Sequence, residues 1–268
     1  MRNPRAALRA GYLGAILVVM YVPILIVIVY SFNESRLSSL WSGFSLRWYA
    51  ELFRDRALFE ALRNSVVLAL IASFSAAVIG TLGAVGARST PAGSLRKGLE
   101  GLAILPIMIP EIILGMALLA FFAFLALPLG MLTLAIAHTT FCIPYVYMVV
   151  RARLAGLEKT YVEAAKDLGA GEGRAFFDIT LPLILPAVVS GMLIAFAMSF
   201  DDVIVSVFVT GPSANTLPIR IFTQIKTGVT PKTNALCALM FVVTIALCLA
   251  SAALGRYRKT NGEQDAAL

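Results

Sequence analysis

Three carboxylates interrupt long apolar runs of this sequence and are its strongest candidates for chemistry. Glu111 lies in "LPIMIPEIILGMALL", and Asp201 and Asp202 lie in "AMSFDDVIVSVFVTGP", with the hydroxyl of Ser199 beside them. A carboxylate within a membrane span is costly, and such groups are usually paired or take part in moving a solute. The apolar runs contain no Lys or Arg, so these acids have no cationic partner there. They predict an acidic pathway that suits a cationic solute.

Alternatives remain for each acid. Glu111 lies about 11 residues into its run, roughly mid-membrane at about 1.5 Å per residue, where it could instead form a hydrogen bond between helices. The two aspartates could lie just outside a span and cap the following helix. However, the apolar stretch continues to about residue 209, which favours the outer half of a longer span.

Aromatic residues could add cation–π contacts to an alkylammonium solute, and Trp48, Tyr145 and Phe200 are the candidates. Trp48 belongs to the loop 33–63, in which "LRWYAELFRDRALFEALRN" predicts one amphipathic helix resting on the outer membrane interface. There Trp48 could serve as an external gate or dock a binding protein.

The composition requires a membrane environment for these groups. Hydrophobic residues make up 59% of the 268 residues and charged residues only 14%, unlike soluble domains. A helix needs roughly 20 apolar residues to cross about 30 Å of hydrocarbon, and the runs predict six transmembrane helices in an all-α integral membrane protein. One transmembrane domain covers 1–268, with spans at about 11–32, 64–87, 101–126, 129–150, 183–209 and 234–255.

The distribution of Lys and Arg predicts the orientation. An even number of spans puts both termini on one side, and that side carries the larger share of basic residues. The positive-inside rule therefore places both termini in the cytoplasm. The net charge of +7 mainly expresses this bias and does not indicate nucleic-acid binding. The first apolar run is too long for a cleaved signal and is expected to remain as an anchor.

The polar segment 151–182 lies between the fourth and fifth spans, on the cytoplasmic side. Thr160 and Glu163 have the spacing of a capping box, which predicts the start of a helix. Gly169 is suited to end that helix in a left-handed conformation, and Gly171 and Gly173 allow a turn. A second short helix would follow and end at Pro182. Such a helical finger suggests docking to a cytoplasmic partner, although a self-packed loop is the alternative.

The same segment resembles the EAA motif found in permease subunits of bacterial ABC importers. The motif positions present are Glu163, Ala164, Ala165, Gly169, Ile179, Leu181 and Pro182. The resemblance implies that this finger is a coupling helix inserted into a separate ATPase, which would bind ATP and Mg²⁺. Glu172 could pair with that ATPase or with Arg174. The implied role is a non-catalytic permease subunit, with no cofactor of its own, in the bacterial inner membrane.

A wider resemblance covers nearly the whole chain. "YSFNESR", "SLRWY", "HTTFCIPYVYMVVRARL" and "GVTPKTNAL" are similar to C-type permease subunits of spermidine/putrescine importers. This resemblance implies a B-type permease partner, two ATPase subunits and a periplasmic binding protein for polyamines. Family members often have Asp where Glu111 stands. Within the implied pathway, Glu111, Asp201 and Asp202 would be transient ligands for ammonium groups.

Other functional classes remain open or are disfavoured by missing motifs. An ABC permease for another organic cation, amine or opine, or an ion-coupled secondary transporter, would also carry intramembrane acids. A membrane-embedded enzyme is disfavoured because HExxH and GxSxG are absent, and no GxxxxGK[ST] cradles a phosphate. Cys142, Cys237 and Cys248 lie in apolar runs without metal-ligand spacing and are expected to be buried thiols. His138 is expected to be a neutral, hydrogen-bonded packing residue.

Overall fold

The computed structural model describes the chain except residues 1–3, 37–39, 158–159, 168, 213 and 247–268. Within this part every regular element is helical, apart from one isolated bridge between Asn33 and Phe44. The elements are α1 (Pro4–Tyr30), α2 (Arg47–Phe53), α3 (Arg56–Ser89), α4 (Ser94–Met108), α5 (Glu111–Phe124), α6 (Met131–Ala155), α7 (Thr160–Asp167), α8 (Glu172–Ala175), the π-helical turn η1 (Phe176–Thr180), α9 (Leu181–Asp201), α10 (Ile204–Val209) and α11 (Leu217–Thr227). A further apolar helix covers Pro231–Ala246.

Among the described residues, four helical stretches are long and apolar enough to cross a membrane. They are Gly11–Tyr30, Arg56–Ser89, Met131–Ala155 and Glu172–Asp201. The pair α4 and α5 makes a fifth candidate, but the two helices are bent by 106° at their junction. The predicted third span, 101–126, covers this bent pair. Of the predicted sixth span, residues 247–255 and Cys248 lie outside the described residues.

The chain divides into two compact units, Met1–Arg56 with Thr223–Leu268 and Ala57–Phe222. In the first unit, the indole of Trp48 donates a hydrogen bond of 2.7 Å to the Asn33 carbonyl oxygen. Lys232 donates to the Asp55 carboxylate over 2.7 Å. These contacts hold the loop after α1 and the corner after α2 within this unit.

The single amphipathic helix predicted over this loop is two helices. The chain leaves α2 at Arg54, whose N–H donates to the Glu51 carbonyl, and the Asp55 N–H donates to the Leu52 carbonyl; α3 begins at Arg56. Polar Arg54 and Asp55 favour a turn at this point. The second half of the predicted interface helix is therefore continuous with the second span.

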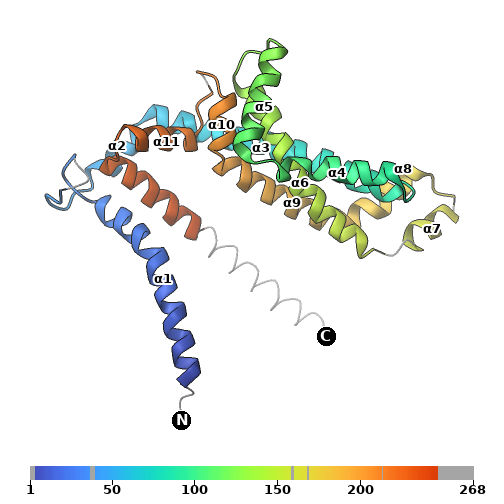
Figure 1. Cartoon of the computed structure of the whole chain (residues 1–268), viewed down its shortest axis with the longest axis horizontal. Coiled ribbons are helices and arrows are strands. Elements are labelled where there is room, and N and C mark those ends of the chain that lie inside the picture. Colours follow the sequence, from blue (N-terminus) through green and yellow to red (C-terminus); the bar gives the residue numbers. More distant parts are fainter. Residues whose placement is uncertain (1–3, 37–39, 158–159, 168, 213, 247–268) are drawn as a thin grey trace. The chain divides into compact units, whose positions relative to one another are not determined.

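The core of the second unit follows α6, which packs along α9 and along α4 (Figure 1). One buried cluster joins α6 to alanines of α3 and to Ile184 and Ala195 of α9. Close approach needs small residues, since a Cβ at Gly80 would lie 3.0 Å from the Tyr147 nitrogen and one at Gly191 3.0 Å from the Val146 Cα. Small residues therefore permit the close approach of these helices at Gly80 and Gly191.

Candidate solute pathway and coupling segment

The first candidate acid lies at the break between α4 and α5. Ile109 is extended (φ −85°, ψ 129°), as expected for a residue before proline, and Pro110 supplies no N–H to continue α4. Glu111 is the first residue of α5 and its side chain is exposed. Because the run is bent here, counting residues along a straight span does not give the depth of Glu111.

The other two candidate acids, Asp201 and Asp202, lie at the break between α9 and α10. Their carboxylates have different surroundings. Asp201 is the last residue of α9 and is exposed. Asp202 is extended (φ −66°, ψ 129°), and its side chain is only 7% exposed. Its carboxylate accepts hydrogen bonds from the N–H groups of Val205 (3.3 Å) and Ser206 (2.8 Å). Asp202 therefore caps α10, the alternative that the sequence left open.

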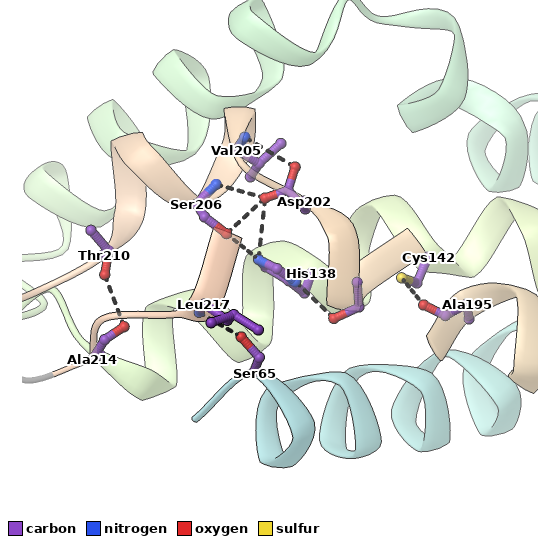
Figure 2. A network of polar contacts seen from close by, with 11 residues as sticks. Ser65, His138, Cys142, Ala195, Asp202, Val205, Ser206, Thr210, Ala214 and Leu217 are labelled. Atoms are coloured by element: carbon purple, nitrogen blue, oxygen red, sulfur yellow. Dashed lines mark hydrogen bonds and ion pairs between the residues drawn. The ribbon is translucent and has the colours of Figure 1, made fainter. Parts of the chain in front are cut away.

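A buried polar network surrounds this cap (Figure 2). The Ser206 hydroxyl donates to Asp202 Oδ2 over 2.7 Å. His138 of α6 lies with Nε2 2.9 Å from Ser206 Oγ and 3.5 Å from Asp202 Oδ2, and with Nδ1 2.8 Å from Ser199 Oγ. His138 and Ser206 are fully buried and Ser199 is 3% exposed. The predicted packing role of His138 agrees with this burial and these hydrogen bonds.

The structure thus separates the predicted pathway residues into two groups. Glu111 and Asp201 are exposed at two helix breaks, whereas Ser199 and Asp202 are held inside the network. Trp48 belongs to the other compact unit, where the residue is 6% exposed. Sequence reasoning missed Ser206: an Asp ahead of a helix start signals a cap to backbone N–H groups, but it does not identify a Ser hydroxyl as a further partner.

The predicted helix of the coupling segment is present as α7, beginning at Thr160. The Thr160 side chain, which the capping box requires, lies outside the described residues. Gly169 has φ +86°, the left-handed conformation predicted for it. The Ala170 N–H donates to the Ala165 carbonyl over 3.0 Å, the bond that closes a Schellman motif. Ala164 is exposed and Ala165 is 9% exposed, so only one of the two alanines presents an open surface.

The second half of the segment differs from the prediction. Pro182 does not end a short helix before the fifth span, because helix runs without a gap from Glu172 to Asp201. Pro182 occupies the first turn of α9, where a missing N–H is tolerated. The preceding turn is π-helical, with the Leu181 N–H bonded to the Phe176 carbonyl. This wider turn lets the chain pass the proline without a break.

A cavity of about 340 Å³ lies beside this segment. Its lining includes Tyr161, Glu163 and Glu172 from the segment and Arg88 from the end of α3. Arg88 donates to the carbonyl oxygens of Leu154 and, over 2.8 Å, of Leu157, and so caps the end of α6. A cation at a helix C-terminus is favourable. The Arg88 side chain therefore connects α3 to the start of the coupling segment, at Leu154 and Leu157.

Across the described ranges, no group of three or more His, Cys, Asp or Glu side chains could hold a metal ion. The site therefore consists of exposed carboxylates at helix breaks, a buried polar network behind one of them, and a separate helical segment.

Comparison with known proteins places this geometry in context. Residues 76–258 match the family model described as "Binding-protein-dependent transport system inner membrane component". The spermidine/putrescine transport system permease protein PotC of Haemophilus influenzae is 42% identical over 253 residues, covering 94% of this chain and 98% of that protein. The putrescine transport system permease protein PotI of Escherichia coli K12 is 43% identical over 230 residues, with 82% of this chain and 81% of PotI covered.

Solved structures agree on the fold. A bacterial ABC transporter involved in the import of the acidic polysaccharide alginate superposes with a TM-score of 0.70 at 14% identity, covering 96% of this chain and 98% of that chain. The MetNI methionine ABC transporter, in inward-facing conformations, gives a TM-score of 0.62 at 18% identity over 78% of this chain and 95% of its own.

Proposed function

Because the chain belongs to the family of binding-protein-dependent transport system inner membrane components, we propose that it is the C-type permease subunit of an ATP-driven polyamine importer. Membership makes it a multi-pass inner-membrane transport subunit. The polyamine assignment draws on the transport systems for which the similar proteins PotC and PotI are named. It also fits the acidic character of the predicted pathway.

The observation that carries the solute class is the exposure of two carboxylates at two helix breaks. Glu111 begins α5 after the 106° bend, and Asp201 ends α9. We assign both as successive, weak ligands for the ammonium groups of a polyamine. Weak contacts in series bind a cation without trapping it. Asp202 and Ser199 support this part of the pathway from inside the buried network, and Trp48 supports the loop through which a binding protein would dock.

The proposal includes the six spans at the predicted positions, both termini in the cytoplasm, and one permease domain over 1–268. The four long helices, the bent pair α4 and α5, and the apolar helix Pro231–Ala246 are compatible with these spans. The larger share of Lys and Arg on one side supports the orientation.

The coupling segment 151–182 is proposed to dock in a separate ATPase subunit. The contact residues would be Glu163, Ala164, Ala165, Gly169, Glu172, Leu181 and Pro182. In support, α7 is short, ends at a left-handed Gly169 and presents Glu163 and Ala164 on its exposed surface. The complete importer would contain a B-type permease, two ATPase subunits that bind ATP and Mg²⁺, and a periplasmic binding protein.

The test is transport by the assembled complex. The chain is co-purified with its partner subunits and reconstituted in proteoliposomes with the binding protein, and ATP-dependent uptake of putrescine and spermidine is compared with that of a neutral amino acid and of sulfate. We expect uptake of putrescine and spermidine, and no uptake of the neutral amino acid or of sulfate. Preference for a neutral or anionic solute, or uptake without the ATPase, would reject the proposal.

A paired variant tests the ligands. Glu111→Gln combined with Asp201→Asn is expected to lower kcat/KM for putrescine by at least about tenfold, since each lost charge-assisted contact is worth about 1.5–3 kcal/mol. Glu60→Gln is the matched control, because Glu60 is also an exposed acid but lies outside the proposed pathway. Equal kcat/KM in both variants would remove Glu111 and Asp201 from the pathway.

A further inference from the structure

We propose that His138 is a positioning residue for the solute pathway, acting through Asp201. Its imidazole joins the two helices on either side of the break at which the Asp201 carboxylate is exposed, and so holds that carboxylate in place. The inference rests on the proposed function, in which Asp201 is a ligand for an ammonium group.

His138 bridges the break between α9 and α10. Nδ1 lies 2.8 Å from the hydroxyl of Ser199, in the last turn of α9. Nε2 lies 2.9 Å from the hydroxyl of Ser206, in the first turn of α10. One rigid, planar side chain of α6 therefore fixes the end of one helix and the start of the next (Figure 2).

The direction of the hydrogen bonds follows from the Asp202 carboxylate, which is the last acceptor in the series. An ionised Asp202 carboxylate only accepts, so the Ser206 hydroxyl donates to it over 2.7 Å. Ser206 Oγ is then available to accept from His138 Nε2–H, which assigns the neutral tautomer protonated at Nε2. Nδ1 accepts in turn from the Ser199 hydroxyl. Every donor in the series has an acceptor, so the bonds strengthen one another.

Burial makes this arrangement difficult to replace. His138 and Ser206 are fully buried and Ser199 is 3% exposed. Removing the imidazole would leave the Ser199 hydroxyl without its acceptor and the Ser206 oxygen without its donor, and such a loss inside the protein costs more than the loss of an ordinary exposed hydrogen bond. The helix ends would have to move to restore their hydrogen bonds.

Asp201 is the residue that such a movement would displace. It is the last residue of α9, next to Asp202 in the chain, and two residues after Ser199. Its own side chain is exposed, so the direction of the carboxylate depends on how α9 ends and where α10 begins. Productive ligands must be held within about 0.5 Å, and the bridge through His138 supplies that constraint.

The test uses three variants in the complete reconstituted transporter, with putrescine as the probe. His138→Leu removes both polar contacts, His138→Gln keeps an amide near the Nε2 position, and His138→Asn keeps one near Nδ1. His138→Leu is expected to raise KM for putrescine about tenfold, with a smaller change in kcat. His138→Gln should recover most of the wild-type KM, because its amide N–H can donate to Ser206, and His138→Asn should recover less.

A double variant separates positioning from general packing. If His138 acts through Asp201, adding His138→Leu to Asp201→Asn should raise KM no further than Asp201→Asn alone. An additive increase, or an unchanged KM in His138→Leu, would overturn the positioning role and leave the proposed function standing. If Asp201→Asn itself leaves KM unchanged, the ligand assignment fails, and the inference with it. Should His138→Leu not assemble, equal KM values for His138→Gln and His138→Asn would overturn the inference.

Discussion

Asp201 and Asp202 are adjacent in the chain, yet their carboxylates lie in different surroundings. Asp202 accepts two backbone N–H groups and one hydroxyl and caps α10, whereas Asp201 is exposed at the end of α9. A carboxylate that already accepts several short hydrogen bonds has few free lone pairs for a passing cation. At the residue scale, the pair therefore consists of one structural group and one candidate ligand.

This difference predicts that the same substitution changes thermal stability at one position and not at the other. Asp202→Asn should lower the melting temperature of the purified complex, because the amide puts an NH₂ donor among groups that donate to the carboxylate, at a cost of about 1–3 kcal/mol. Asp201→Asn should leave the melting temperature unchanged. Thermal unfolding of both variants in detergent checks this, and equal melting temperatures would contradict the structural role of Asp202.

Prolines have opposite effects at two places in the fold, and the neighbouring turn explains the difference. At Pro110, the preceding Ile109 is extended and the run breaks into α4 and α5. At Pro182, the preceding π-helical turn and the position in the first turn of α9 allow the helix to continue. At the element scale, proline indicates a discontinuity, but its local hydrogen bonds decide whether the helix stops.

The end of α7 permits a prediction about coupling. Gly169 has φ +86°, a conformation that costs an alanine about 1 kcal/mol or more. Gly169→Ala should therefore loosen the turn after α7 and reduce the ATPase activity stimulated by loaded binding protein. Gly173→Ala is the matched control, since Gly173 lies in α8 and a Cβ added there would meet no atom within 4 Å. Wild-type stimulation in Gly169→Ala would show that this turn does not transmit the signal.

At the scale of the whole molecule, the arrangement of the spans determines which side of the membrane each connection faces. Long apolar helices lie at the first, second, fourth and fifth predicted runs, although the fifth run was drawn to residue 209 and α9 ends at Asp201. The third is bent, and the sixth is described only to residue 246. Basic residues favour the cytoplasm for both termini, for the turn before α4 and for the coupling segment.

Labelling with a membrane-impermeant thiol reagent checks this orientation in intact spheroplasts. Leu129→Cys, in the turn before α6, should react from outside, whereas Ser94→Cys, at the start of α4, should react only after permeabilisation. Both positions are exposed. The unsubstituted chain, with its own cysteines, provides the background. Reaction of Ser94→Cys in intact spheroplasts would reverse the proposed orientation.

Features that depend on neighbouring residues could be predicted from the sequence. The apolar runs indicated an all-α chain with long apolar helices, Gly169 indicated its left-handed turn, and the start of α7 followed from its local pattern. Helix propensity and backbone conformation are set within a few residues. The corner at Arg54 and Asp55 and the continuous helix through Pro182 were not predicted, since a short polar or proline signal is compatible with either a break or a continued helix.

The partners of the polar residues were decided by the tertiary structure. The sequence placed Asp201, Asp202 and Ser199 in one group and His138 in another, and it offered capping only as an alternative for the aspartates. His138 meets Ser199 and Ser206 across 61 and 68 residues of chain. Such contacts depend on how α6 packs against α9 and α10, and a hydrogen bond requires its two atoms within about 3 Å. Only the packing of these helices, which are distant in the sequence, could decide that the Asp202 side chain is buried and that of Asp201 is exposed.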